Sequence, residues 1–238
     1  MTMDILGIRI DDYAIEDLEE RLAEMLESGE GSIFAATLNP EILLKAHQNA
    51  GYKKILNQAD LNICDGFGLK LVSFFKEKRI KNRWAGADLV DFLLGLASQK
   101  KYQILAIVSR NSLSSPEEIE KSLEKKYPNI PARSIYFDTG QNFFENGIIK
   151  KAEIVLVNFG APDQEKFIAE NREKFPKAKI FVGVGGTFDF LTGKIRRAPQ
   201  VWRSLGFEWL WRLVQEPKRI HRIANAVIIF PITALMND

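Results

Sequence analysis

The chain has 238 residues, of which 46% are hydrophobic and 27% charged, and its formal net charge is +2. This composition is typical of a soluble globular protein with one large or two small domains. The single cysteine, Cys64, excludes an intramolecular disulfide and a cysteine-cluster zinc site, and it fits a reducing compartment. No secretory signal is visible at the N-terminus, and no apolar run reaches the length of about 20 residues that a membrane-spanning helix needs.

Hydrophobic spacing predicts helices and strands that alternate along most of the chain. Apolar residues at helical spacing predict a helix over 14–28, and a short apolar run predicts a buried strand over 32–39. Asn39 as an N-cap followed by Pro40 indicates that a helix begins there and runs through the segment 39–50. By the same rules we expect strands over 60–64, 102–108, 132–138, 152–160 and 178–186, and helices within 65–78 and over 86–100, 115–128 and 162–175.

This alternation predicts an α/β fold of the Rossmann-like type, with a mostly parallel sheet and helices on both faces. No repeat or linker interrupts the pattern before about residue 195. We therefore expect a core over 1–194 and a C-terminal helical appendage over 195–238, which we call the tail. Ligands of open parallel sheets bind outside the carboxyl ends of the strands, so the residues after each predicted strand are the candidate site.

Polar and glycine-containing sequence follows several of these strands. Thr37, Asn39, Asp65 and Gln164 all fall at predicted carboxyl ends. Each also has an ordinary structural explanation, as a strand end, a helix cap, a turn residue and a solvent-facing amide respectively. Because all four are expected at the carboxyl edge of the sheet, we favour one common site over four unrelated surface positions. Arg83 is a further candidate that could equally be a surface charge.

Several familiar cofactor motifs are absent or incomplete. The stretch Gly66-Phe67-Gly68 begins like a dinucleotide fingerprint, but Leu71 stands where the third glycine belongs, so an NAD-dependent oxidoreductase remains only an alternative. No P-loop motif occurs. The two histidines, His47 and His221, form no metal motif, and no Asp-x-Asp pair is present to hold Mg²⁺ on a diphosphate. We expect no bound metal and no cofactor.

The tail has an unusual composition. It holds seven basic against three acidic residues and three of the four tryptophans, Trp202, Trp209 and Trp211. Interleaved Trp and Arg suit a membrane–water interface, where rings lie at headgroup level and cations meet lipid phosphate, so we expect contact with an anionic membrane surface. Packing on the core or on a second subunit of a homo-oligomer is the competing explanation, and a non-catalytic membrane-binding module remains possible. Nucleic acid is not expected as a partner.

Seven motifs together resemble those of the WecG/TagA/CpsF glycosyltransferases. They occur in the family's order and extend over nearly the whole chain. The motifs are TLNPE (37–41), DGFG (65–68), RWAGAD (83–88), GAPDQE (160–165), VGGTFDFLTG (184–193), RAPQVW (197–202) and GFEWLWRLVQEPKR (206–219).

The resemblance implies an inverting, metal-independent transfer of a sugar from a UDP-linked donor to a polyprenyl-diphosphate-linked sugar. It favours N-acetylmannosamine as the sugar and lipid-linked N-acetylglucosamine as the acceptor, in the synthesis of a cell-surface polymer such as wall teichoic acid. UDP-linked N-acetylmannosaminuronic acid and UDP-glucose are alternative donors within the family. A cytoplasmic enzyme held peripherally on the inner face of the cell membrane is the expected location.

The resemblance also implies roles for individual residues. It identifies Asp65 as the general base, with Thr37, Asn39 and Gln164 as further site residues, and Gly66 and Gly68 as leaving room for the diphospho-sugar. The tail arginines that would close over the diphosphate are Arg212, Arg219 and Arg222. The other expected substrate-binding residues are Arg83, Gly185, Gly186, Thr187 and Asp189. The turn Ser109–Ser112 departs from the glycine-rich turn of many members, as RWAGAD departs from a commoner pattern, and both lie where the donor sugar could be contacted.

Overall fold

A computed structural model describes residues 2–28, 31–76, 79–138, 143–217 and 220–237 of the chain. These residues form one eight-stranded sheet with the order β1-β2-β4-β3-β8-β7-β5-β6, in which β1 and β2 are antiparallel and all other neighbours are parallel. The strands are β1 Thr2–Ile5, β2 Ile8–Asp11, β3 Ile33–Leu38, β4 Leu61–Cys64, β5 Ile104–Val108, β6 Ala132–Tyr136, β7 Ile154–Asn158 and β8 Ile180–Gly183.

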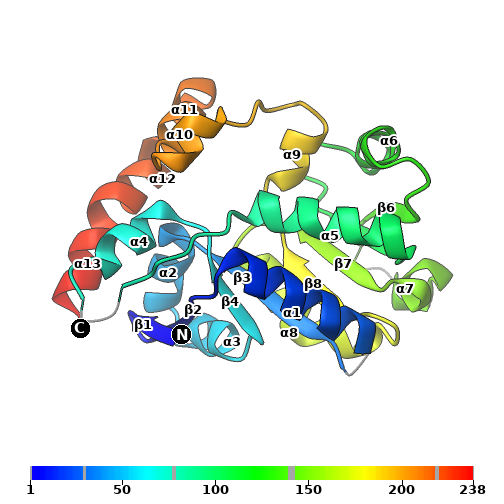
Figure 1. The fold of residues 1–238 in the computed structure, drawn as a ribbon, viewed down its shortest axis with the longest axis horizontal. Coiled ribbons are helices and arrows are strands. Elements are labelled where there is room, and N and C mark those ends of the chain that lie inside the picture. Colours follow the sequence, from blue (N-terminus) through cyan, green and yellow to red (C-terminus); the bar gives the residue numbers. More distant parts are fainter. Residues whose placement is uncertain (1, 29–30, 77–78, 139–142, 218–219, 238) are drawn as a thin grey trace.

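Helices cover both faces of this sheet, as Figure 1 shows for α1 and α5 on the near side. The core helices are α1 Ile15–Ser28, α2 Pro40–His47, α3 Ala50–Asn57, α4 Phe67–Ser73, α5 Gly86–Lys100, α6 Pro116–Lys126, α7 Gly147–Lys151, α8 Asp163–Asn171 and α9 Thr187–Leu191, with short 3-10 turns at Phe143–Glu145 and Arg172–Lys174. The predicted α/β class with a mostly parallel sheet and two helical layers is therefore confirmed.

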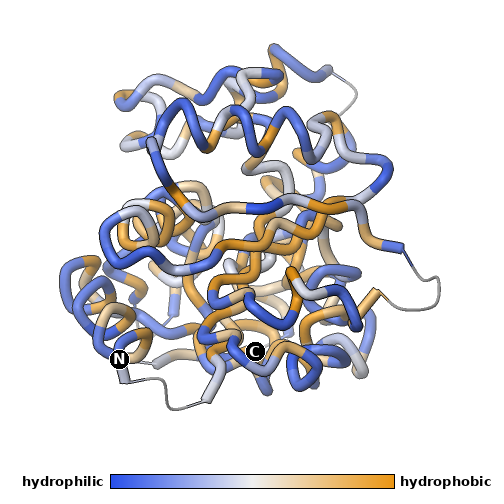
Figure 2. The backbone as a smooth tube through the Cα atoms, turned by 90° about the vertical axis from the view of Figure 1, so that its right-hand side faces the viewer, coloured by the Kyte–Doolittle hydropathy of each residue, from blue (hydrophilic) through white to orange (hydrophobic). Residues whose placement is uncertain are grey.

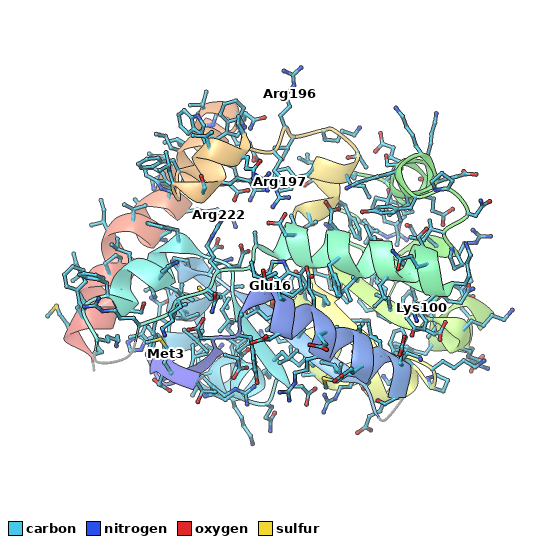
Figure 3. The ribbon with its side chains drawn as sticks, viewed as in Figure 1. Met3, Glu16, Lys100, Arg196, Arg197 and Arg222 are labelled. Atoms are coloured by element: carbon cyan, nitrogen blue, oxygen red, sulfur yellow. The ribbon has the colours of Figure 1, made fainter. Side chains whose placement is uncertain are left out.

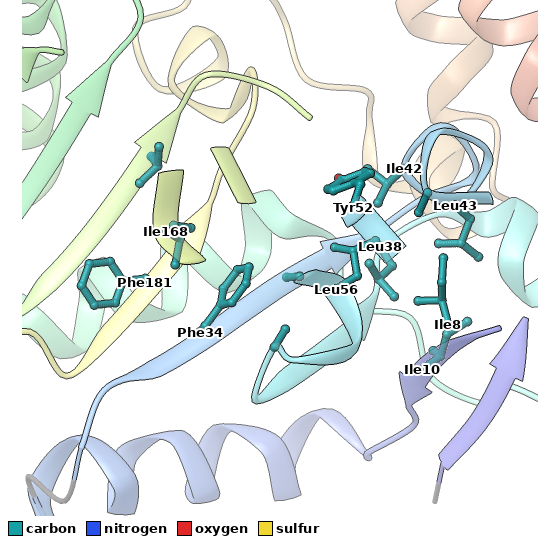
Figure 4. Close-up of a cluster of buried hydrophobic side chains, with 14 of the residues drawn as sticks. Ile8, Ile10, Phe34, Leu38, Ile42, Leu43, Tyr52, Leu56, Ile168 and Phe181 are labelled. Atoms are coloured by element: carbon teal, nitrogen blue, oxygen red, sulfur yellow. The ribbon is translucent and has the colours of Figure 1, made fainter. Parts of the chain in front are cut away.

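Alternation along the strands explains the two layers. In β7, Ile154 and Leu156 pack with α1, α5 and α6, whereas Val155 and Val157 pack with α2, α3 and α8. Successive side chains of a strand point to opposite faces, so a continuous apolar run serves two cores at once. Figure 4 shows part of the core that lies on the α2, α3 and α8 side of the sheet. Figure 2 shows that hydrophobic residues concentrate in the interior of the molecule and hydrophilic residues at its periphery.

Several local features differ from the expectation, and the short helices α7 and α9 are among the elements that were not predicted. The N-terminal hairpin β1–β2 was not predicted; its turn is Leu6-Gly7, with φ of 57° and 74°, values that a tight two-residue hairpin requires. The helix expected through 39–50 ends at His47, because Asn49 accepts a hydrogen bond from the Tyr52 N–H at 2.9 Å and so caps a new helix, α3.

The tail forms α10 Gln200–Ser204, α11 Glu208–Gln215, α12 Ile220–Ala224, the π-helical turn η4 Asn225–Ile229 and α13 Phe230–Met236. It arches over the carboxyl ends of the strands and descends beside α4 (Figure 1). Phe230 and Ala234 are fully buried in the same cluster as Leu43 of α2 and Leu69 of α4. The end of the tail is thus part of the core, while the division at residue 194 stays a prediction. No helix in the described ranges is long and apolar enough to cross a membrane.

We predict that Phe230→Ala destabilises the whole protein and not only the tail. Replacing a fully buried phenylalanine by alanine leaves a cavity and typically lowers the free energy of unfolding by about 3–5 kcal/mol. Ile232→Ala, two residues further along the same helix at a half-exposed position, is the control and should change it by less than about 0.5 kcal/mol. Urea unfolding followed by tryptophan fluorescence measures both, and equal, small effects would show that α13 does not contribute to the core.

Candidate active site

A cleft of about 970 Å³ opens at the carboxyl edge of the sheet, between the ends of β3, β4, β7 and β8 and the tail. Eleven of the twelve residues predicted for the site line this cleft. They are Thr37, Asn39, Asp65, Arg83, Gln164, Gly185, Gly186, Thr187, Asp189, Arg212 and Arg222. The twelfth, Arg219, lies outside the described residues. Sequence positions from 37 to 222 are therefore brought together in one place.

Asp65 lies directly after β4, where its backbone N–H donates to the Leu38 carbonyl at 2.9 Å. Loss of water around the half-buried carboxylate is the largest cause that raises the pKa of Asp65 to about 6, and the negative charge of Glu208 adds to the rise. Arg83, the Gly86 N–H and Arg212 oppose it. A carboxylate with a pKa near 6 is mostly ionised at pH 7 and still basic enough to accept a proton during a reaction.

Arg83 connects the floor of the cleft to the tail. Its Nη1 donates to the Asp65 carbonyl at 3.2 Å and its Nη2 to the Arg203 carbonyl at 3.2 Å. The same guanidinium lies 3.9 Å from the Glu208 carboxylate. The Arg83 guanidinium thus contacts the protein on both sides of the cleft. That it also binds substrate stays a prediction.

A second ionic contact joins the tail to the core next to Arg83. The Asp88 carboxylate, at the start of α5, lies 2.7 Å from Nη1 of Arg197 and 3.5 Å from Nη1 of Arg203. These side chains are less than half exposed, so the pairs lose less of their strength to water than a surface pair does. In Figure 3, Arg197 lies on the side of the tail that faces the sheet, whereas its neighbour Arg196 points outward. Sequence reasoning missed Asp88, although the motif RWAGAD ends on it.

Thr37 and Asn39 have structural partners in addition to their place in the cleft. The Asn39 Oδ1 accepts from the Ile42 N–H at 3.1 Å, so Asn39 is the N-cap of α2 as its sequence context indicates. The buried Thr37 donates from Oγ1 to the Gly183 carbonyl at 3.4 Å and ties β3 to β8. A Cβ atom on Gly86 would lie 3.2 Å from Thr37 Oγ1, so glycine allows α5 to begin this close to β3.

Gln164 holds the two loops that form one wall of the cleft. Its Oε1 accepts from the Gly160 N–H at 3.2 Å and from the Gly185 N–H at 3.0 Å. Both glycines have positive φ, 74° and 48°, which suits glycine and disfavours other residues. The side chain is 4% exposed, so Gln164 is not the solvent-facing amide that its position in the first turn of α8 also allowed. It shapes the wall whether or not it also touches a substrate.

A buried carboxylate behind Gln164 fixes the direction of its amide. The Glu165 Oε1 accepts from Gln164 Nε2 at 2.7 Å, and Oε2 accepts from the Tyr52 hydroxyl at 2.9 Å. With its NH₂ group engaged, Gln164 must present Oε1 to the two loop N–H groups. Desolvation raises the pKa of Glu165, which is 1% exposed. Sequence reasoning missed Glu165 and Tyr52, because nothing local shows that an acid in an amphipathic helix is buried.

The residues after β8 begin the short helix α9. Gly186 is its N-cap, and Thr187 donates from Oγ1 to the Val184 carbonyl at 2.7 Å. Asp189 is 6% exposed and accepts from the Ser114 hydroxyl at 2.8 Å. Asp189 therefore secures α9 to the segment before α6 as well as lining the cleft.

Two tail arginines reach the cleft from the opposite side. The Arg212 guanidinium lies 4.6 Å from the centre of the Phe190 ring, a cation–π arrangement. Arg222 pairs with Glu41 at 2.9 Å from its Nε, and Glu41 also pairs with Lys45. Figure 3 places Arg222 on the part of the tail beside the sheet. The tail thus brings two guanidinium groups to the cleft, alongside the carboxyl groups of Glu208 and Glu216.

Gly66 and Gly68 have a packing role that the sequence interpretation did not include. A Cβ atom on Gly66 would lie 2.5 Å from Pro40 Cδ, and one on Gly68 would lie 2.7 Å from Pro40 Cγ. These glycines let the start of α4 approach the start of α2, which places Asp65 next to Asn39. Space for a substrate is therefore not needed to explain them, although both also line the cleft.

Comparison with known proteins agrees with this architecture. The sequence profile of the WecG/TagA/CpsF family of glycosyl transferases matches residues 3–237, and the chain belongs to this family. It is thus a glycosyltransferase by class. Among the described residues no cluster of three or more His, Cys, Asp or Glu side chains is placed to hold a metal ion.

Three curated relatives are each called N-acetylglucosaminyldiphosphoundecaprenol N-acetyl-beta-D-mannosaminyltransferase. The protein of Bacillus spizizenii is 33% identical over 203 residues, which cover 84% of this chain and 77% of the relative. That of Staphylococcus aureus is 28% identical over 233 residues, covering 95% and 89%. That of Bacillus subtilis is 32% identical over 195 residues, covering 80% and 74%.

We predict that the Asp65 carboxyl group titrates near pH 6, and that Glu208→Gln lowers its pKa. Removing the negative charge of Glu208 removes one cause of the rise and leaves Arg83 free to favour the ionised form. The measurement is ¹³C NMR of carboxyl-labelled aspartate, with the signal assigned by its loss in Asp65→Asn. Glu124→Gln, an exposed position on α6, is the control and should leave the titration unchanged. A pKa near 4 in the wild type would show that the carboxylate is fully hydrated.

Proposed function

We propose that this enzyme transfers N-acetylmannosamine from its UDP-linked form to N-acetylglucosamine carried on a polyprenyl diphosphate. The observation that carries the proposal is Asp65, a carboxylate of raised pKa on the floor of a cleft that two tail arginines also line. The choice of sugars rests on the names of the three relatives. The expected context is synthesis of a cell-surface polymer of the wall teichoic acid type.

In the proposed reaction, Asp65 accepts the proton of the acceptor hydroxyl. The hydroxyl oxygen forms a bond to the anomeric carbon of the donor sugar on the face opposite the diphosphate. The bond from that carbon to the diphosphate oxygen breaks with its electron pair, so UDP leaves and the configuration inverts. General-base help of this kind contributes about 10²–10⁴-fold to the rate.

Negative charge that develops on the departing UDP needs compensation, and the chain has the groups for it. Arg212 and Arg222 line the cleft, as does the loop of Gly185, Gly186 and Thr187. The N–H groups of Gly185 and Thr187 donate to Gln164 Oε1 and the Val184 carbonyl, so the Gly186 N–H is the backbone donor that the proposal assigns to the diphosphate. Arg222 would exchange Glu41 for the diphosphate when the substrates bind. Because charged donors aimed at the leaving group can replace a metal ion in this role, we propose that the transfer needs neither a metal nor a cofactor.

The remaining predicted residues position the reacting groups in this proposal. Asn39 keeps its Nδ2 group for a sugar hydroxyl, because Oδ1 caps α2. Gln164 sets the two glycine loops, and Thr37 fixes β3 against β8 beneath Asp65. Ser109, Asn111 and Ser112 line the same cleft, so donors with an N-acetylmannosaminuronic acid or glucose group belong in the same assays.

We further propose that the enzyme works at the inner face of the cell membrane without crossing it. The relatives' names specify a lipid-linked substrate. The tail presents exposed apolar side chains such as Trp202, Phe207 and Ile228 among its arginines, a combination suited to an anionic lipid surface.

Asp65→Asn should lower turnover by about 10²–10⁴-fold while UDP binding changes little, because asparagine keeps the shape but cannot take the proton. Radiolabelled sugar transfer and calorimetric UDP binding measure the two effects. The exposed Asp17→Asn on α1 is the matched control and should retain full activity. Near-normal turnover of Asp65→Asn would show that Asp65 is only a turn residue.

EDTA should leave the transfer rate unchanged in the wild-type enzyme, since the proposal assigns charge compensation to the arginines and the Gly186 N–H group. The assay uses UDP-N-acetylmannosamine and a prenyl-diphosphate-N-acetylglucosamine acceptor with and without excess chelator. Strong inhibition that Mg²⁺ reverses would overturn metal independence while leaving the sugar transfer itself intact.

A further inference from the structure

We infer that the apolar end of the cleft binds the first isoprene units of the lipid-linked acceptor; the inference rests on the proposed function. This end, which we call the prenyl groove, lies between α4 of the core and the helix formed by α12, η4 and α13. Its lining residues are Phe67, Leu71, Ile223, Ala226, Val227 and Pro231.

The character of the cleft changes along its length. Around Asp65 the lining consists of hydroxyl, amide, charged and glycine residues from the ends of four strands. The part between α4 and the 220–236 helix is lined almost entirely by hydrocarbon. A UDP-sugar has polar groups along its whole length and gives this end nothing to bind. A lipid-linked sugar has a diphosphate at one end and a hydrocarbon chain at the other, and it matches both ends of the cleft.

The apolar surface of α4 leads outward from the catalytic carboxylate. Phe67 and Leu71, four residues apart on one face of the helix, are 38% and 49% exposed and line the cleft. Phe74 and Phe75 follow at 56% and 67% exposed, outside it. With a rise of about 1.5 Å per residue, α4 extends roughly 9 Å away from Asp65 between Phe67 and Ser73, and Phe74 and Phe75 follow its end.

The 220–236 helix provides the opposite wall. Arg222 lines the cleft, and Ile223 follows it directly, so a cation suited to a diphosphate stands at the head of an apolar surface. Val227, 44% exposed, continues that surface. The two walls are in contact, because a Cβ atom on Gly68 of α4 would lie 3.6 Å from the Ala226 carbonyl oxygen.

An exposed apolar stripe of this kind usually has an occupant. The prenyl chain is the occupant we assign, because the stripe is continuous with a cleft that already holds the proposed base and the diphosphate-binding arginines. A second copy of the chain is the competing occupant. A copy covering the groove would close the outer end of the cleft, whereas the prenyl chain keeps the acceptor's diphosphate beside Arg222.

The test uses purified full-length enzyme and acceptors in which N-acetylglucosamine diphosphate carries a methyl group or one, two, three or four isoprene units, all below their micelle-forming concentrations. The variants are Leu71→Asn and Val227→Asn, and Val214→Asn is the matched control. Val214 is 76% exposed on α11 and does not line the cleft. Thermal unfolding verifies that each variant is folded.

For the wild type we expect kcat/KM to rise with each of the first isoprene units and then to level off. Each buried methylene group is worth about fourfold in binding, so Leu71→Asn and Val227→Asn should each lower kcat/KM for the three-unit acceptor by about 5- to 50-fold. Both should stay within about twofold of wild type for the methyl acceptor, and Val214→Asn should match wild type throughout.

Other results would overturn the inference. An equal loss for the methyl and three-unit acceptors, or an unchanged dependence on chain length in both variants, would show that the groove does not hold the chain. If Val227→Asn instead turns a dimer into a monomer on sedimentation while keeping the wild-type chain-length dependence, the groove is a subunit interface. Absence of transfer to every acceptor from UDP-N-acetylmannosamine by the wild type would reject the proposed function itself, an outcome distinct from all of these.

Discussion

The geometry of the cleft depends on one guanidinium group. Arg83 donates to the carbonyl of Asp65 on the floor and to the carbonyl of Arg203 in the tail, and it faces the Glu208 carboxylate. A planar guanidinium can serve several acceptors at once in fixed directions, which a lysine ammonium cannot reproduce. Because of this bridge, the backbone of Asp65 and the tail are held by the same side chain. A substitution in the tail that moves Arg83 would therefore also move the backbone of Asp65.

The raised pKa of Asp65 has an energetic consequence for the fold. Its folded-state pKa is about 6, above the value of about 4 for an unfolded aspartate, so the folded protein holds the proton more tightly between these values. Stability from this group is fully present below about pH 4 and falls as the pH rises through 6. At neutral pH the ionised carboxylate therefore destabilises the folded state. The buried hydrogen bonds of Glu165 and the partly exposed ion pairs of Asp88 help to hold the site in place against that cost.

Sequence pattern was sufficient for the parts of the fold that local physics decides. Buried strands such as β7 and capped helices such as α6, with Ser115 and Pro116 at its start, were predicted because their signals lie within a few residues. Their positions after predicted strands also indicated that Thr37, Asp65 and Gln164 lie close together, and all three line one cleft. Glu165 and Tyr52 were beyond its reach, since their hydrogen bond spans 113 residues and only tertiary packing buries the acid.

Residues 220–236 contact three different environments: the cleft, the core and the solvent. Pro231 has no N–H and would clash with the carbonyl four residues earlier, so the preceding turn widens, and the Phe230 N–H donates to the Asn225 carbonyl five residues back. The extra residue in that turn shifts the faces of the helix relative to each other. Ile223 and Val227 before the proline can then line the cleft while Phe230 and Ala234 enter the core. Ile228, Ile232 and Leu235 remain exposed. A regular helix would align these faces differently, so the π-helical turn is what allows the segment anchored in the core also to form a wall of the prenyl groove.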